Sequence, residues 1–267
     1  MLPVDSLEED MLIEEIISCE VIYMEVGAKT SIGRIRDINQ DSYYISPNNK
    51  YPLFIIADGM GGHKAGEIAS KMAVEIISSS LENDSENIIM DENYIINRIK
   101  NSIWRANDEI YKKSLERNEC SGMGTTVTLV WDINGKFYIG HVGDSRAYLL
   151  RGNNLYQITE DHSLVEELIR NGSISREEAK HHPQKNIITR AVGTNKDIEV
   201  DIIVEDKYKG DILLLCTDGL TNMLNDDEIK ELLLVNENIQ KACEYLVELS
   251  NNKGGFDNIS VVAIKYM

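Results

Sequence analysis

The sequence predicts an α+β fold in which antiparallel sheets are layered against helices. Apolar runs of strand length are joined by short hairpin turns, and helical segments come in groups instead of alternating with single strands. No Pro-, Gly- or Ser-rich linker and no internal repeat divides the 267 residues. We therefore expect one large domain with antiparallel sheets and not a doubly wound parallel sheet.

The first half of the chain supplies short strands and two helices. Three apolar runs are expected as strands: 25–31, 42–46 and 52–57. A helix is expected from about Ala65 to Leu81, and a longer one from about Glu92 to Arg117. Strands and helices are thus grouped, which favours a layered arrangement.

A hairpin signal lies in the middle of the chain. The segments 124–132 (GTTVTLVWD) and 136–144 (KFYIGHVGD) are strand-like, and Asn134-Gly135 lies between them. A type I′ turn prefers Asn-Gly because both of its central residues need positive φ. Residues 145–159 predict a second hairpin.

A polar segment then interrupts the sheet pattern. Residues 163–190 contain two short helical pieces (SLVEELIRNG and SREEAK) and the run His181-His182-Pro183. We interpret this segment as an inserted surface subdomain. The remaining expected elements are strands at 198–204 and 211–216, helices at about 226–234 and 237–251, and a last strand at 258–265.

The chain is strongly acidic. Its 27 basic and 45 acidic residues give a formal net charge of −18, which argues against a nucleic-acid backbone or an anionic membrane as the main partner. No apolar run approaches the roughly 18 residues of a membrane span, and no basic segment precedes an apolar one near the start. We expect a cytoplasmic protein that is neither secreted nor embedded in a membrane.

The cysteines predict reduced core thiols and not disulfides. They are far apart and form no Cys-x-x-Cys pair, and a chain of 267 residues can build a core without covalent cross-links. The four positions are Cys19, Cys120, Cys216 and Cys243.

The amino-terminal residues differ in composition from the rest. The first 28 residues hold eight acidic residues but no Lys or Arg. Apolar pairs at 12/16 and 13/17 have helical spacing, so this stretch is either a short amphipathic helix or a poorly ordered extension of the kind common at chain ends. We expect an acidic extension over 1–23 and one domain over 24–267.

Three aspartates lie at the ends of buried strand-like runs. Asp58 stands in LFIIADGMGGH, Asp218 in DILLLCTDGL and Asp257 in GGFDNISVV. A carboxylate in such a place is costly unless a cation or hydrogen bonds compensate it, so three together suggest a shared cation. Carboxylate oxygens suit Mg²⁺ or Mn²⁺ and not zinc. The alternative for each Asp-Gly pair alone is a turn residue that accepts backbone hydrogen bonds.

Further charged residues lie in loops between strands. Arg36 could bind a phosphate bidentately, and Asp41, five residues on, could hold a metal-bound water. The alternative is a loop salt bridge. Asp144, beside Ser145 and Arg146, lies at a turn between two strands and on its own would be a turn residue. The nearby glycine clusters match neither dinucleotide nor P-loop motifs, so a nucleotide site is unsupported.

Taken in chain order, these segments resemble the metal-dependent PPM (PP2C-type) Ser/Thr protein phosphatases, and closely the bacterial branch that opposes Hanks-type kinases. The resemblance runs from about Val26 to Ile264. It implies an α-β-β-α sandwich, two antiparallel sheets between helical layers, with a dimetal centre at one end. The motifs that carry it are GRIRDINQDS, ADGMGGHKAGE, SGMGTT, HVGDSRAYL, TEDHSL, HPQKNIITRAVG, CTDGL and GGFDNIS.

The resemblance implies a ligand set for two Mn²⁺ or Mg²⁺ ions. Asp58, Asp218 and Asp257 would ligate one ion. Asp58, with the carbonyl of Gly59, would ligate the other, and Asp41 would act through water.

The resemblance implies three further roles. Arg36 would bind the substrate phosphate. Asp144 with Asp218 would form a weaker third-metal site, and residues 163–190 would be the flap of the family.

These residues predict hydrolysis by a water that two cations activate, without a phosphoenzyme. Arg36 and the metals would neutralise the charge on the phosphate oxygens. Many eukaryotic members carry Asp-Gly-His where this chain has Met60, which cannot be an acid. We interpret His63 as a surface or loop residue and assign protonation of the leaving group to metal-bound water.

We therefore predict a protein serine/threonine phosphatase that acts on phosphorylated proteins, opposes a Hanks-type Ser/Thr kinase and works as a monomer. A phosphoprotein-binding pseudophosphatase is the alternative, although it would be expected to lose at least one aspartate ligand. A metallophosphatase with His-rich ligands would need several histidines near the aspartates, whereas His63 is the only histidine inside one of the three aspartate motifs. A cysteine phosphatase is excluded because it needs Arg six residues after its nucleophile, whereas those positions hold Glu25, Thr126, Asn222 and Leu249.

Overall fold

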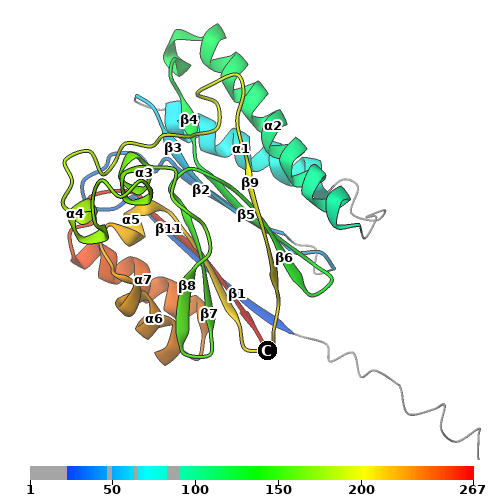
Figure 1. Ribbon diagram of the computed structural model, residues 1–267, viewed down its shortest axis with the longest axis vertical. Helices are drawn as coiled ribbons and strands as arrows, with labels where there is room; N and C mark the ends of the chain where they lie inside the picture. Colours follow the sequence, from blue (N-terminus) through cyan, green and yellow to red (C-terminus); the bar gives the residue numbers. More distant parts are fainter. Residues whose placement is uncertain (1–22, 47–49, 63–64, 83–90) are drawn as a thin grey trace, which may run out of the picture.

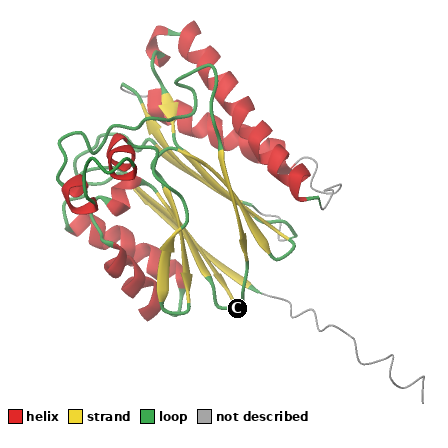
Figure 2. Ribbon diagram, viewed as in Figure 1, coloured by secondary structure: helices red, strands yellow, loops and turns green. Residues whose placement is uncertain are grey.

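Two antiparallel sheets pack face to face, and helices cover the outer face of each (Figures 1 and 2). The computed structural model describes residues 23–46, 50–62, 65–82 and 91–267. The expected α-β-β-α sandwich is therefore confirmed. The expected helix near residue 12 and Cys19 lie outside the described residues, as does His63.

The first sheet carries both ends of the described chain. Its strands, in spatial order, are β1 (Met24–Ser31), β11 (Ile259–Tyr266), β10 (Ile212–Cys216), β7 (Arg146–Arg151) and β8 (Asn154–Gln157). Its outer face packs on three helices: α5 (Asp218–Thr221), α6 (Asp226–Val235) and α7 (Ile239–Asn252). Side chains such as Leu214, Val261 and Leu246 form the apolar layer between them.

The second sheet lies under the two long helices. Its strands are β2 (Asp41–Ile45), β3 (Leu53–Met60), β5 (Val127–Ile133), β6 (Lys136–Val142) and β9 (Asp201–Asp206), and the short β4 (Gly124–Thr125) also pairs with β3. The helices are α1 (Ala65–Glu82) and α2 (Glu92–Glu116), followed by the 3₁₀ turn η2 (Asn118–Cys120). In the described part of the chain, none of the helices is long and apolar enough to cross a membrane.

The core explains why the strand sequences are apolar without interruption. In β3, Phe54 and Ile56 face the other sheet, whereas Leu53 and Ile55 face the helices. Because neighbouring side chains of a strand point to opposite faces, a strand buried on both faces needs apolar residues at every position. The run that opens the Asp58 motif is therefore a central strand.

Several predicted details are confirmed. Asn134 and Gly135 have φ values of 49° and 76° and join β5 to β6, as a type I′ turn requires. Cys120, Cys216 and Cys243 are buried free thiols. The polar segment 163–190 holds two short helices, α3 (Leu164–Arg170) and α4 (Arg176–Lys180), as Figure 1 shows.

The expected strand at 198–204 begins later, at Asp201. The ladder between β6 and β9 ends at the pair His141 and Asp201, because β6 stops one residue later and the chain turns toward β7. Ahead of the strand, the carbonyl of Ile198 accepts a hydrogen bond from Trp104 Nε1 (3.0 Å) instead of a ladder bond. The short elements η2 and α5 were not expected, and the strand expected at 124–132 is divided into β4 and β5.

The division between an extension and a domain gives a first prediction. Every element described here begins at Met24 or later, and β1 is tied along its whole length to β11. A chain that starts at Met24 should therefore fold with a melting temperature within a few degrees of the full chain. A drop of more than about 8 °C in a thermal scan would mean that residues 1–23 pack on the domain.

Candidate active site

Five aspartates from both sheets meet at one end of the sandwich. Asp41 opens β2 and lies directly opposite Asp58 in the β2–β3 ladder. Asp218 follows β10, and Asp257 precedes β11, so the first sheet contributes these two. Asp144 lies in the turn between β6 and β7. The structure thus brings together carboxylates that are as many as 216 positions apart in the sequence.

The backbone at Asp58 is fixed by two threonines. Its N–H donates to Thr126 Oγ1 (2.8 Å), and its carbonyl accepts from the N–H of Thr126 (2.8 Å) and from Thr125 Oγ1 (2.9 Å). Thr126 Oγ1 also lies 2.7 Å from Ser145 Oγ, next to Asp144. These bonds hold the Asp58 and Asp144 segments in a fixed relation, because fully satisfied buried polar networks are rigid.

The glycines after Asp58 and Asp218 are required by close packing and not by turn geometry. Neither Gly59 nor Gly219 is among the described glycines with positive φ. A Cβ on Gly59 would lie 2.1 Å from the carbonyl oxygen of Gly66, and one on Gly219 would lie 1.9 Å from that of Asn258. Each Asp-Gly pair therefore marks a place where two backbones touch. Neither pair is a simple turn, because Asp58 and Gly59 lie within β3 and Asp218 and Gly219 begin α5.

Asn258 holds the loop that carries Arg36. Its Nδ2 donates to the carbonyls of Ile32 (2.9 Å) and Ile38 (3.0 Å), and its Oδ1 accepts from the N–H of Gln40 (2.8 Å). Arg36 is thereby placed beside the aspartates, and its Nη2 donates to Asp257 Oδ2 (2.7 Å). Half of the Arg36 side chain (51%) remains exposed, so the guanidinium borders the site and solvent together.

The carboxylates raise one another's pKa. Burial is the largest cause, and the neighbouring negative charges add to it. The pKa of Asp41 rises to about 7 and that of Asp144 to about 8. The pKa of Asp218 rises to about 6, with Asp257 as its strongest negative neighbour, and the pKa of Asp58 lies well above its usual range. The cluster is an unfavourable concentration of negative charge unless something positive compensates it.

Three carboxylate oxygens in the cluster point to such a compensating group. Among the described residues, Oδ1 of Asp41, Asp144 and Asp218 is buried and has no hydrogen-bond partner. Buried oxygens of this kind normally find a partner, and hard divalent cations such as Mg²⁺ and Mn²⁺ prefer oxygen ligands. Over the same described residues, no three acidic, His or Cys side chains already converge at metal-ligand spacing. The donor set fits a divalent cation, and small side-chain adjustments would be needed to close around it.

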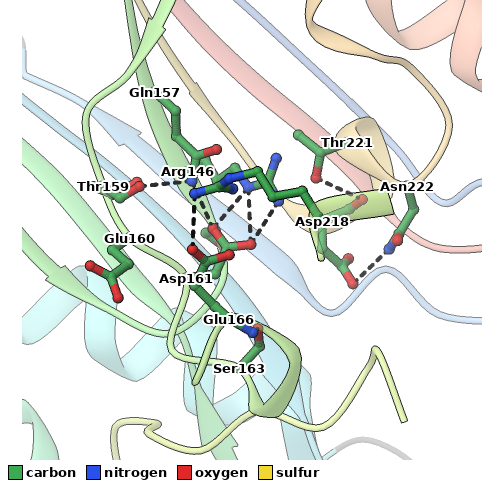
Figure 3. A network of polar contacts seen from close by, with 12 residues as sticks. Arg146, Gln157, Thr159, Glu160, Asp161, Ser163, Glu166, Asp218, Thr221 and Asn222 are labelled. Atoms are coloured by element: carbon green, nitrogen blue, oxygen red, sulfur yellow. Dashed lines mark hydrogen bonds and ion pairs between the residues drawn. The ribbon is translucent and has the colours of Figure 1, made fainter. Parts of the chain in front are cut away.

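Asp161 and His162 were missed by the sequence interpretation, although they lie in the TEDHSL motif. His162 Nδ1 accepts from the N–H of Gly143 (3.0 Å), and the N–H of His162 donates to the carbonyl of Gly143 (2.8 Å). On the other side of Asp144, Arg146 makes a bidentate contact with Asp161 (2.8 and 2.7 Å; Figure 3). Asp161 and His162, which directly precede the 163–190 segment, therefore bond to residues on both sides of Asp144: Arg146 and Gly143, respectively.

Comparison with known proteins places this geometry in a family. The family model described as protein phosphatase 2C matches residues 34–251. The serine/threonine phosphatase stp of Listeria monocytogenes is 40% identical over 243 residues, which cover 91% of this chain and 96% of the relative. The chain belongs to the protein phosphatase 2C family.

Solved structures agree. The Streptococcus agalactiae serine/threonine phosphatase superposes with a TM-score of 0.85 at 38% identity, covering 91% of this chain and 99% of that one. The catalytic domain of the phosphatase PstP, solved in complex with two manganese ions, gives a TM-score of 0.81 at 31% identity and covers 92% and 99% of the two chains. The chain is a protein serine/threonine phosphatase of the bacterial PPM type, as the sequence predicted.

The raised pKa values predict how the stability of the metal-free protein depends on pH. A carboxylate whose pKa is higher in the folded state contributes stability that is present below its unfolded pKa, near 4, and is lost as the pH rises through the folded value. In EDTA, unfolding free energy should therefore fall as the pH rises from about 5 to 8. Chemical denaturation at several pH values measures this.

Asp144→Asn should reduce the fall in unfolding free energy that the metal-free protein shows at high pH. It removes one buried charge, so we expect the metal-free variant to be more stable than the unsubstituted protein at pH 8 by on the order of 1–3 kcal/mol. Asp227→Asn is the matched control, because the Asp227 side chain is 93% exposed and should change little. Equal stability of Asp144→Asn and the unsubstituted protein at pH 8 would contradict the charge cluster.

Proposed function

We propose that this phosphatase removes phosphate from phosphoserine and phosphothreonine by a metal-dependent reaction at the five-aspartate cluster. Asp58, Asp218 and Asp257 would hold one Mn²⁺ or Mg²⁺ ion, and Asp58 with the Gly59 carbonyl would hold a second. Asp41 would act through water. When bound, such ions supply a nucleophilic water of lowered pKa and neutralise charge on phosphate. The partnerless buried oxygens of Asp41 and Asp218 are the observation that carries this proposal.

Arg36 is assigned to the substrate phosphate. A guanidinium has five N–H donors in a planar fork, so one of them can keep the Asp257 contact while others face a phosphate oxygen. The bond to Asp257 raises the pKa of Arg36, so the side chain is charged at every working pH. Arg36 would thereby stabilise the charge that the phosphate oxygens carry during transfer.

The departing Ser or Thr oxygen has to be neutralised by something other than Met60. Met60 ends β3 and pairs with Gly124, and a thioether has no proton to donate. His63 lies outside the described residues. We assign the proton to water at the site, and Asp144 with Asp218 to a third, loosely bound cation.

The physiological partners follow from the reaction class. The substrates are phosphorylated proteins, and we propose that the enzyme opposes a Hanks-type Ser/Thr kinase and its substrates, and that it works as a monomer. Residues 24–267 would form the catalytic domain, with 163–190 as a flap over the site. The bonds from Asp161 and His162 to the Asp144 turn support this, because they attach the start of that segment to the cluster.

One assay separates this enzyme from a catalytically weak phosphoprotein-binding protein. Hydrolysis of para-nitrophenyl phosphate and of a phosphothreonine peptide is measured in EDTA and with added Mn²⁺. Turnover of both substrates that depends on Mn²⁺ supports the proposal. Tight peptide binding without turnover at any Mn²⁺ concentration would favour the binding protein.

Substitution of the proposed ligands should separate metal binding from folding. Asp58→Asn, Asp218→Asn and Asp257→Asn should each lower Mn²⁺-dependent turnover by at least about 100-fold, because a ligand that holds the ion is lost. Calorimetric titration should show weakened Mn²⁺ binding while the far-UV spectrum stays native. Near-normal turnover in any of the three would remove that residue from the ligand set, and Asp227→Asn serves again as the control.

Loss of Arg36 should act mainly on substrate capture. Arg36→Ala should raise KM for a phosphopeptide by about 10- to 100-fold, since a charge-assisted hydrogen bond contributes roughly 1.5–3 kcal/mol. Arg36→Lys keeps the charge but not the fork and should recover only part of the loss. Arg105→Ala removes an exposed arginine from α2 and is the control. An unchanged KM and kcat in Arg36→Ala would reduce Arg36 to a loop salt bridge.

A further inference from the structure

Two exposed apolar side chains stand directly beside the proposed phosphate site. Ile35 is 65% exposed and precedes Arg36 in the chain, and Phe256 is 61% exposed and precedes Asp257. Arg36 and Asp257 are joined by their 2.7 Å ion pair. Single exposed apolar residues are common on protein surfaces. These two are distinguished by their place, because each adjoins a residue of the same ion pair.

The two loops that carry these side chains are joined into one rim. The N–H of Arg34 donates to the carbonyl of Gly255 (2.7 Å), and the Arg34 side chain donates to the carbonyl of Asn251 (2.7 Å). Gly33, at φ 82°, packs so closely that a Cβ would lie 2.2 Å from the carbonyl oxygen of Asp257. Bonds thus flank Ile35 on both sides and hold its loop against the one that presents Phe256.

Because Ile35 and Phe256 adjoin the Arg36–Asp257 ion pair in the chain, a substrate protein whose phosphate binds Arg36 passes next to them. A phosphoserine side chain is short, so the substrate backbone passes close to the residues around Arg36. Each further residue of an extended substrate advances by about 3.3–3.6 Å. Residues one or two positions from the phosphoresidue therefore come within reach of the rim. A substrate side chain that contacts the rim removes apolar surface of Ile35 and Phe256 from water, and this favours an apolar substrate side chain.

Resting on the proposed function, we propose that Ile35 and Phe256 form an apolar substrate-binding rim, which selects phosphoproteins with an apolar side chain within two positions of the phosphoserine or phosphothreonine. The net charge of the protein adds to the selectivity. The protein carries a net charge of −18, so an acidic flanking residue is repelled over the whole approach, whereas an apolar one is not.

The test compares two phosphothreonine peptides, one flanked by Leu on both sides and one flanked by Gly, with para-nitrophenyl phosphate as the substrate that has no flanking residue. For Ile35→Ser and Phe256→Ser, the ratio of kcat/KM on the Leu peptide to kcat/KM on nitrophenyl phosphate should fall by about 5- to 30-fold, through KM. The same ratio for the Gly peptide should stay within about twofold. Leu115→Ser, an exposed apolar residue on α2 (70%), is the matched control.

The outcomes separate the rim from the chemistry. A wild-type preference for the Leu peptide that both rim variants lose supports the proposal. Equal effects on the Leu and Gly peptides, no effect in either variant, or the same effect in Leu115→Ser would overturn it. Absence of Mn²⁺-dependent nitrophenyl phosphate turnover in the wild type would instead contradict the proposed function. Both rim residues are largely exposed, and a thermal scan of each variant checks that the fold is kept.

Discussion

The repulsion among buried carboxylates is the constraint on which the rest of this structure depends. Asp41, Asp58 and Asp218 are gathered where water is scarce, and each has a raised pKa because of burial and of the other negative charges. Folding gains nothing from such a cluster by itself. A bound cation would offset this repulsion. The same cation would supply the positive charge and the free coordination positions that phosphoryl transfer requires.

The sandwich explains how so costly an arrangement is held. Asp41 and Asp58 lie on strands of one sheet, and Asp218 and Asp257 lie next to strands of the other, so the cluster forms only when the sheets are packed together. Thr217, which precedes Asp218, donates to Asp41 Oδ2 (3.0 Å) and ties the two sheets at the site itself. The apolar layer between the sheets therefore sets the distance between carboxylates from opposite sides. The packing of the two sheets therefore determines the geometry of the carboxylate cluster.

The sequence predicted most of the fold because the strongest signals were local. The Asn134-Gly135 turn and the apolar runs around Phe54 and Leu214 need no tertiary context to interpret, and motif order then indicated the layers. The start of β9 was misplaced, because it depends on where β6 ends and on a hydrogen bond from Trp104, 94 positions away from Ile198. Local pattern carries no information on such a partner.

The sequence predicted the charged residues of the candidate site but not the polar residues that hold them in place. Asp58, Asp144, Asp218, Asp257, Asp41 and Arg36 all lie in one place, yet their catalytic roles remain proposals. Asn258, Thr126 and His162 were passed over because a polar side chain that bonds to backbone has no distinctive spacing. For Asp58 and Asp218 the sequence left a simple Asp-Gly turn open as the alternative, whereas contacts with Gly66 and Asn258 require the two glycines. Gly219 contacts Asn258, which is far away in the sequence. Gly59 contacts Gly66, in the first turn of α1.

The most direct test of this account is a crystal structure of the protein grown with Mn²⁺, in which anomalous scattering locates the metal. The account predicts two manganese positions that share Asp58, one of them also bound by Asp218 and Asp257, with Arg36 at the rim. A fully active protein whose manganese ions lie away from these carboxylates would contradict it.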